Sequence, residues 1–148
     1  MSDHRNVSGH CLCRAVKFIY DALPNWVLHC HCESCRRAAS APVVTWISVP
    51  RASFHFTEGT PRYYRSSKQV TRAFCGNCGS PLTYENDEFS DEVHLYAASL
   101  AEPNGIDVSR HVFVDEQLDW FEIQDHLPRY ATTGEGGAKP IRHGPKTG

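Results

Sequence analysis

Hydrophobic and polar positions alternate along most of this chain with a period of two. Val16, Phe18 and Tyr20 fall on one face of a segment whose opposite face carries Lys17. Side chains that alternate in this way point to opposite sides of a β-strand. The same pattern predicts further short strands at residues 43–49, 54–56, 61–65, 70–74, 81–84, 93–98, 111–114 and 120–123.

Only one stretch favours a helix, at about residues 34–39, and it is short. The sequence shows no longer helical periodicity and no internal repeat. We therefore expect a mostly-β fold of many short antiparallel strands, with at most one short helical turn.

The length of 148 residues suits one domain with a single hydrophobic core, which we place at residues 1–130. Five of the ten glycines lie within residues 134–148, together with Pro140 and Pro145 and few apolar side chains. Such a segment cannot bury enough surface to offset its ordering entropy, so residues 131–148 are predicted to form a flexible basic tail. The alternative is an arm that becomes ordered on a partner subunit.

Charge and hydropathy bear on partners and location. The formal net charge is −2; residues 128–148 carry four Lys or Arg against one Glu, a balance of +3, which leaves −5 for residues 1–127. A domain with this balance is a poor phosphate binder, so we expect no nucleic-acid partner.

No stretch approaches the roughly 20 apolar residues that cross a membrane, and residues 1–7 lack the apolar region of a signal peptide. We expect a cytoplasmic protein without membrane contact. The sequence gives no indication of oligomeric state.

Seven cysteines are the unusual feature of the composition. An odd number cannot all pair as disulfides, and a reducing compartment keeps thiols available as metal ligands or nucleophiles. They form three clusters, at Cys11-Leu12-Cys13, at Cys30-His31-Cys32-Glu33-Ser34-Cys35 and at Cys75-Gly76-Asn77-Cys78.

The first and third clusters together predict a closed zinc site. Cys11 and Cys13 would present two sulfurs on one face of a strand, and Cys75-x-x-Cys78 has the form of a zinc knuckle. Two such pairs supply the four tetrahedral sulfurs of a structural zinc site. A redox CxxC pair is the competing interpretation, but no βαβ pattern surrounds it. Disulfides and buried apolar cysteines fit the spacing less well.

The middle cluster predicts a different kind of site. Cys30, Cys32 and Cys35 offer three sulfurs to one metal and leave a fourth position open, as catalytic zinc sites do. An open site of three sulfurs suits a soft thiolate ligand, so a small thiol is the expected partner. The alternative is that His29 or His31 fills the fourth position and makes a second structural site. Successive side chains of an extended segment point to opposite sides, so both histidines would point away from the sulfurs of Cys30 and Cys32. A cysteine-nucleophile hydrolase that uses this cluster with a histidine is a weaker alternative.

The chain resembles the glutathione-dependent formaldehyde-activating enzyme family, which also includes centromere protein V-like proteins. The matching pieces are Gly9-His10-Cys11-Leu12-Cys13, His29-Cys30-His31-Cys32-Glu33-Ser34-Cys35-Arg36, Phe74-Cys75-Gly76-Asn77-Cys78-Gly79-Ser80 and the segment from His111 to Trp120. Their order and spacing extend from about residue 8 to residue 130.

This resemblance implies a β-tent of folded-over antiparallel sheets pinned by two zinc ions. It assigns Cys11, Cys13, Cys75 and Cys78 to a structural zinc and Cys30, Cys32 and Cys35 to a catalytic one. It also implies a carbon–sulfur lyase that forms or cleaves S-hydroxymethylglutathione from glutathione and formaldehyde. A non-catalytic zinc-binding interaction module of the same fold is the alternative function.

Overall fold

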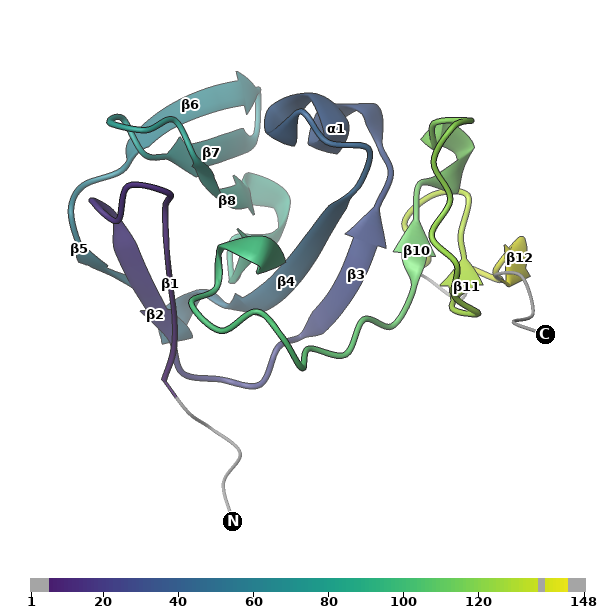
Figure 1. Ribbon diagram of the computed structural model, residues 1–148, viewed down its shortest axis with the longest axis horizontal. Coiled ribbons are helices and arrows are strands. Elements are labelled where there is room, and N and C mark those ends of the chain that lie inside the picture. The colour runs from purple at the N-terminus through teal and green to yellow at the C-terminus, as the bar shows by residue number, and fades with distance from the viewer. Residues whose placement is uncertain (1–5, 136–137, 144–148) are drawn as a thin grey trace, which may run out of the picture. The chain divides into compact units, whose positions relative to one another are not determined.

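The computed structural model describes residues 6–135 and 138–143 (Figure 1). The chain divides into two compact units. The first comprises residues 1–26 and 47–106, and the second comprises residues 27–46 and 107–148. Each unit brings together segments that are distant in sequence, and each contains one of the two predicted cysteine sites.

The first unit contains a three-stranded antiparallel sheet in the order β1-β2-β5. Its strands are β1 (Val7–His10), β2 (Lys17–Tyr20) and β5 (Phe54–Glu58). Phe18 is wholly buried and packs against Phe54 at 5.5 Å between ring centroids. Gly9 pairs with Phe18 across the sheet, and a Cβ at Gly9 would lie 2.2 Å from the Phe18 ring. Close packing on the strand that leads to Cys11 therefore requires glycine at this position.

A second group of strands completes the first unit in the order β4-β9-β8-β7-β6. The strands are β4 (Val44–Pro50), of which residues 47–50 belong to this unit, β6 (Arg62–Ser67), β7 (Val70–Phe74), β8 (Pro81–Asn86) and β9 (Glu92–Tyr96). The pairs β6–β7, β7–β8 and β8–β9 are antiparallel. Their wholly buried apolar side chains include Ile47, Val49, Leu82, Val93 and Leu95. Short 3₁₀ turns occupy Arg51–Ser53, Asp87–Phe89 and Ala97–Ser99.

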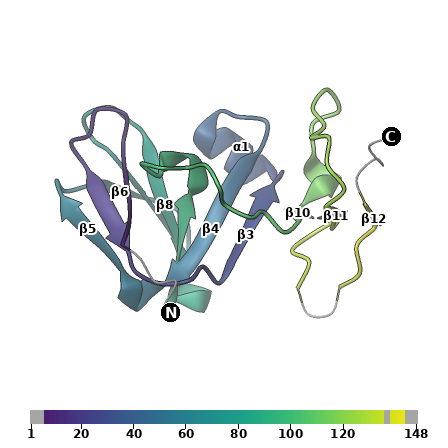
Figure 2. The same ribbon diagram turned by 60° about the horizontal axis from the view of Figure 1, so that its bottom comes forward.

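The second unit is built around β3 (Trp26–Cys30), which enters it at residue 27. The strand β10 (His111–Val112) runs parallel to β3, and β11 (Pro128–Arg129) runs parallel to β10. β12 (Arg142–His143) pairs antiparallel with β11, so these short strands lie side by side (Figure 2). A 3₁₀ turn at Val114–Glu116 follows β10.

The single α-helix of the described residues, α1 (Glu33–Ala39), follows β3 directly. Cys32 is its N-cap residue and Ser40 ends it in the left-handed region at φ 50°. Glu33 and Arg37 form an ion pair of 2.7 Å one turn apart. This local capping explains why the chain turns into a helix immediately after the strand that carries Cys30.

The structure confirms the mostly-β fold and corrects several elements. β1 and β3 were not expected, and residues 120–123 form no strand, because the Gln117 side-chain amide and the Leu118 carbonyl hold Phe121 in a turn. Parallel pairs at β10 join the antiparallel ones. Of the predicted tail at 131–148, residues 136–137 and 144–148 lie outside the described residues, and the boundary at residue 130 stays a prediction.

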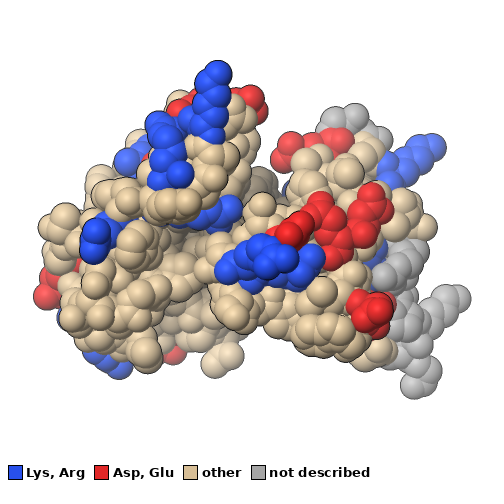
Figure 3. Space-filling model, turned by 90° about the horizontal axis from the view of Figure 1, so that it is seen from above, with Lys and Arg blue, Asp and Glu red and all other residues tan. Residues whose placement is uncertain are grey.

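The surface carries charges of both signs. Figure 3 shows Lys and Arg side chains interspersed with Asp and Glu on the face seen from above. Among the described residues, no helix is both long enough and apolar enough to span a bilayer.

Candidate metal centres

Four cysteine sulfurs converge in the first unit. The sulfurs of Cys11, Cys13, Cys75 and Cys78 all lie within 4.8 Å of one another. Cys11 and Cys13 sulfurs are 3.7 Å apart, and those of Cys13 and Cys75 are 3.8 Å apart. Sulfurs placed about 2.3 Å from a tetrahedral zinc are about 3.8 Å from one another. The observed spacing therefore fits a four-sulfur zinc site.

Two tight turns present these sulfurs, and the first of them differs from the strand expected for Cys11 and Cys13. β1 ends at His10, the Arg14 amide donates to the Cys11 carbonyl, and Arg14 has φ 67°. In the second turn the Gly79 amide donates to the Cys75 carbonyl at 2.8 Å, with Gly79 at φ 80°. A positive φ is easy for glycine, whereas at Arg14 it costs free energy that the turn must offset.

Hydrogen-bond donors surround the four sulfurs. The backbone amides of Val16 and Asn77 point at Cys11 and Cys75 at 3.4 Å each. The Asn77 side-chain amide donates to Cys13 at 3.1 Å and lowers the pKa of that thiol. The Ser80 hydroxyl lies 3.2 Å from the Cys78 sulfur and lowers its pKa to about 5. These donors stabilise thiolates, which are the form that binds a metal.

Three cysteine sulfurs converge in the second unit. Cys30 ends β3, Cys32 caps α1 and Cys35 lies in the first turn of that helix. The three sulfurs lie within 4.8 Å of one another, and those of Cys30 and Cys35 are 3.5 Å apart. Cys30 and Cys35 are buried, whereas Cys32 is partly exposed. Their spacing also fits sulfur ligands of one metal.

Donors again face the sulfurs of this cluster. The Cys35 backbone amide donates to the Cys32 sulfur at 3.3 Å, as an N-cap does, and the Trp46 indole N–H donates to the Cys35 sulfur at 3.3 Å. Hydrogen bonds from the thiols of Cys30 and Cys35 lower the pKa of Cys32 to about 2. Donation to Cys32 raises the pKa of Cys30. The hydrogen bond with Cys30 lowers the pKa of Cys35, but donation to Cys32 and burial outweigh it and raise this pKa to about 11. Negative charge in this cluster is therefore favoured at Cys32.

The fourth position differs between the two clusters. Within the described residues, no fourth Cys, His, Asp or Glu joins Cys30, Cys32 and Cys35 within 4.8 Å. His29 and His31 take other partners: His29 Nδ1 lies 2.7 Å from Thr45 Oγ1, and His31 Nε2 lies 2.8 Å from His111 Nδ1. The first cluster therefore presents four sulfurs, and the second presents three.

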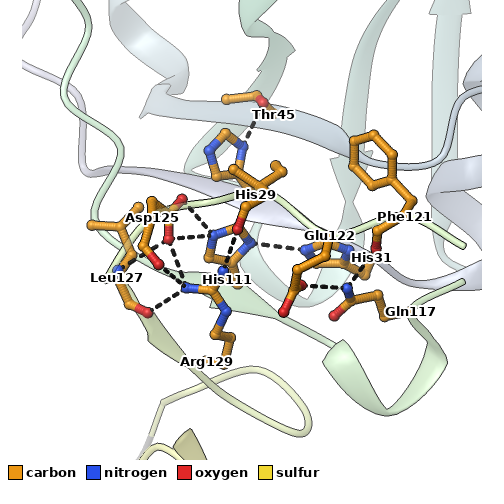
Figure 4. Close-up of polar contacts among 11 residues, drawn as sticks. His29, His31, Thr45, His111, Gln117, Phe121, Glu122, Asp125, Leu127 and Arg129 are labelled. Carbon is orange, nitrogen blue, oxygen red and sulfur yellow. Dashed lines mark hydrogen bonds and ion pairs between the residues drawn. The ribbon is translucent and has the colours of Figure 1, made fainter. Parts of the chain in front are cut away.

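A largely buried polar network in the same unit includes His31, the residue between Cys30 and Cys32 (Figure 4). His111 Nε2 lies 2.9 Å from Asp125 Oδ2, and the Arg129 guanidinium donates to Asp125 Oδ1 at 2.6 Å. Arg129 also donates to the carbonyls of Leu127 and Ile123. Burial raises the pKa of Asp125, but the hydrogen bonds from His111 and Arg129 outweigh burial and hold this pKa at about 2. Burial lowers the pKa of both His29 and His31 to about 4, so these rings are neutral at neutral pH.

Sequence reasoning placed the seven cysteines but missed Trp46, His111, Asp125 and Arg129 as members of the site. Trp46 was expected only as a strand residue, His111 as a strand residue in a segment that carries the family resemblance, and Asp125 and Arg129 lie in a segment without a clear pattern. His31 and His111 are 80 residues apart. No local motif connects positions so distant, so only the fold brings them together.

Comparison with known proteins places the chain in a family. The model of the family "Glutathione-dependent formaldehyde-activating enzyme" matches residues 6–116, which include all seven cysteines. The chain belongs to this family. It is also similar to an uncharacterized lyase of Schizosaccharomyces pombe, with 26% identity over 115 residues that cover 78% of this chain and 83% of the relative.

A solved structure supports the fold. A crystal structure of a Rhodobacter sphaeroides protein matches with a TM-score of 0.55 and 20% sequence identity, covering 68% of this chain and 90% of that one. At this identity the match concerns the fold alone. The family assignment rests on the sequence match and agrees with the clustered cysteines.

Proposed function

We propose that this chain is a zinc-dependent carbon–sulfur lyase that binds a small, glutathione-like thiol at Cys30, Cys32 and Cys35. The reaction forms or cleaves S-hydroxymethylglutathione. In this proposal Cys11, Cys13, Cys75 and Cys78 hold a structural zinc. The family name and the lyase-named relative support the reaction class. The observation that carries the proposal is the set of three sulfurs that no fourth ligand joins among the described residues.

The chain's own residues prepare the site for an anionic ligand. When bound by three sulfurs, zinc would lower the pKa of a thiol that takes the remaining position, so that the thiol is held as a thiolate near neutral pH. The Trp46 indole draws charge from the Cys35 sulfur through its hydrogen bond, and the N-terminal amides of α1 do the same at Cys32. These donors limit the repulsion that three protein thiolates exert on a fourth.

The reaction changes two bonds at carbon. The thiolate sulfur attacks the carbonyl carbon of formaldehyde, a C–S bond forms as the C=O π bond breaks toward oxygen, and the oxygen takes up one proton in place of the one that the thiol lost, which gives S–CH2–OH. In the reverse direction the hydroxyl proton leaves, the C=O π bond forms again, and the C–S bond breaks to release the thiolate. The protein's contribution is to hold both partners at one place, which converts a bimolecular encounter into a step between neighbours.

The direct test is exchange spectroscopy with ¹³C-formaldehyde and glutathione in the presence of the zinc-loaded chain. We expect faster exchange between free and thiol-bound formaldehyde than in the buffer alone. Cys32→Ser should abolish the enhancement, whereas Ser34→Ala, an exposed neighbour in the first turn of α1, should keep it. An enhancement that is unchanged in Cys32→Ser, or none with glutathione and other small thiols, would contradict the proposal.

Metal analysis separates this proposal from a non-catalytic zinc-binding module. We expect two zinc equivalents per chain, of which the one on three sulfurs exchanges with chelators faster than the one on four. Two equally resistant zinc ions without thiol exchange would favour the module. The zinc on three sulfurs should exchange faster because its open coordination position lets the chelator bind before the zinc leaves.

A further inference from the structure

Two buried histidines and the partly buried Asp125 in the second unit form a hydrogen-bonded chain from Asp125 through His111 to His31 (Figure 4). The ring of His111 lies between the other two groups, with Nε2 toward Asp125 and Nδ1 toward His31. His31 and His111 are each 1% exposed. Such a chain has a direction, because each nitrogen of a neutral imidazole is either a donor or an acceptor.

The charge of Asp125 fixes this direction. Its carboxylate is ionised and accepts from Arg129 and from the Leu127 amide, both at Oδ1. Oδ2 can only accept, so His111 Nε2 must carry a proton. The His111 Nδ1 atom is then an acceptor, and the proton between the two rings belongs to His31 Nε2. His31 Nδ1 is left without a proton, and this buried atom has no hydrogen-bond partner among the described residues.

The backbone of His31 is held as firmly as its ring. Its amide donates to the Val112 carbonyl at 3.1 Å, and its carbonyl accepts from the Arg36 guanidinium at 3.2 Å. The same guanidinium also donates to the Glu116 carbonyl. His31 stands between Cys30 and Cys32, so the contacts of its ring and its peptide groups restrain the backbone from which these two cysteines extend.

We propose that Asp125, acting through His111, is a positioning residue for the three-cysteine cluster: it keeps the His31 proton on Nε2 and thereby holds the loop that aims the sulfurs of Cys30 and Cys32. This role rests on the proposed function, in which that cluster binds a metal. Partners that orient a ligand from behind typically change metal affinity about 10- to 100-fold when they are removed. Here the effect of Asp125 passes through two residues, His111 and then His31, before it reaches Cys30 and Cys32.

The same side chains offer a competing arrangement, a third metal site. Ligand atoms of His29, His111 and Asp125 lie within 4.8 Å of one another. However, the Arg129 cation is 2.6 Å from Asp125 and is fully buried, so a divalent cation added there would meet a positive charge. Asp125 is therefore neutralised by Arg129 and hydrogen-bonded by His111, which leaves no need for a metal there.

The test uses nitrogen-15 NMR of the histidine rings in the zinc-loaded full chain. In the wild type we expect His31 and His111 as neutral rings with their protons on Nε2. Asp125→Asn should reverse the chain: its oxygen stays with Arg129 and Leu127, its NH2 group faces His111 Nε2, and the His31 proton moves to Nδ1. Asp119→Asn, an exposed change in the same segment, should leave both rings as in the wild type.

Zinc transfer to a coloured chelator supplies the second readout. Asp125→Asn should release the faster zinc about 10-fold more quickly than the wild type, with the slower zinc unchanged. A wild-type His31 with its proton on Nδ1, or ring signals that shift on binding a third zinc equivalent, would overturn the proposal without any need for the variant. Equal release rates in a folded Asp125→Asn would also overturn it. Zinc missing from the three cysteines would instead contradict the proposed function.

Discussion

The sulfur atoms of Cys13 and Cys75 lie 3.8 Å apart although 62 residues separate them in sequence. Cys13 is in the turn after β1, and Cys75 follows β7. A metal shared by these residues would close a long loop inside the first unit. Closing a long loop restricts the unfolded chain, so the metal would contribute to stability as well as to local order.

Metal removal should therefore unfold the first unit. Structural zinc in small zinc domains contributes on the order of 10 kcal/mol of apparent binding free energy at neutral pH, which is comparable to the whole stability of a domain. We expect circular dichroism to show a lower unfolding temperature after treatment with a strong chelator, and recovery on adding zinc. An identical unfolding temperature with and without metal would show that the four sulfurs close no structural site.

Asn77→Ala should weaken the four-cysteine site without destroying it. The change removes the side-chain donor that lies 3.1 Å from the Cys13 sulfur, so the charge on that thiolate is less well compensated. We expect faster zinc loss from the more slowly exchanging site and a lower unfolding temperature. Asn104→Ala, in an exposed loop of the same unit, is the control and should change neither. If the variant loses zinc from the four-cysteine site at the wild-type rate, the Asn77 donor is dispensable.

Trp46→Phe should act on the other cluster. Phenylalanine keeps most of the buried aromatic surface but lacks the N–H that donates to the Cys35 sulfur at 3.3 Å. We expect the faster zinc to leave about 10-fold more quickly, which is the lower end of the effect of such partners. Trp120→Phe, at a side chain that is 69% exposed, serves as the control. The account of Trp46 would be wrong if both variants released zinc alike.

Gly9→Ala should destabilise the first unit through packing alone. The added methyl would lie 2.2 Å from the Phe18 ring, which is itself wholly buried. Overpacking of this kind typically costs about 1–3 kcal/mol in the free energy of unfolding. Denaturant titration measures the change, with Ser8→Ala at an exposed position of the same strand as the reference. A loss no greater than that of Ser8→Ala would show that the sheet adjusts without cost.

The sequence predicted the fold class because alternation is a local signal. Phe18 and Tyr20 alternate with more exposed neighbours, and in β2 (Lys17–Tyr20) they are the two buried residues. β3 was missed because Trp26, Val27 and Leu28 form a run without alternation, as strands between two neighbours often do. Cys11 and Cys13 were expected on a strand, but the positive φ of Arg14 makes a turn there. The side-chain pattern of these residues does not predict that turn.

The cysteine clusters could be predicted because ligand spacing is also local. Cys30, Cys32 and Cys35 fall within six residues, and the CxxC pair at Cys75 and Cys78 within four. Their surroundings could not be predicted in the same way. Trp46 and Asp125 belong to two segments of the second unit that are far apart in sequence. Only the pairing of β3 with β10 brings His111 beside His31. The residues that tune the site thus depend on tertiary structure.

In the proposed function, Cys30, Cys32 and Cys35 hold a zinc whose fourth position takes a thiol from solution. X-ray absorption at the zinc edge of the two-zinc protein, recorded before and after addition of glutathione, counts the sulfur neighbours of the metal. We expect the average number of sulfur neighbours per zinc to rise, and Cys32→Ser to remove the zinc responsible for the rise. A sulfur count that glutathione leaves unchanged in the fully loaded wild type would contradict that proposal.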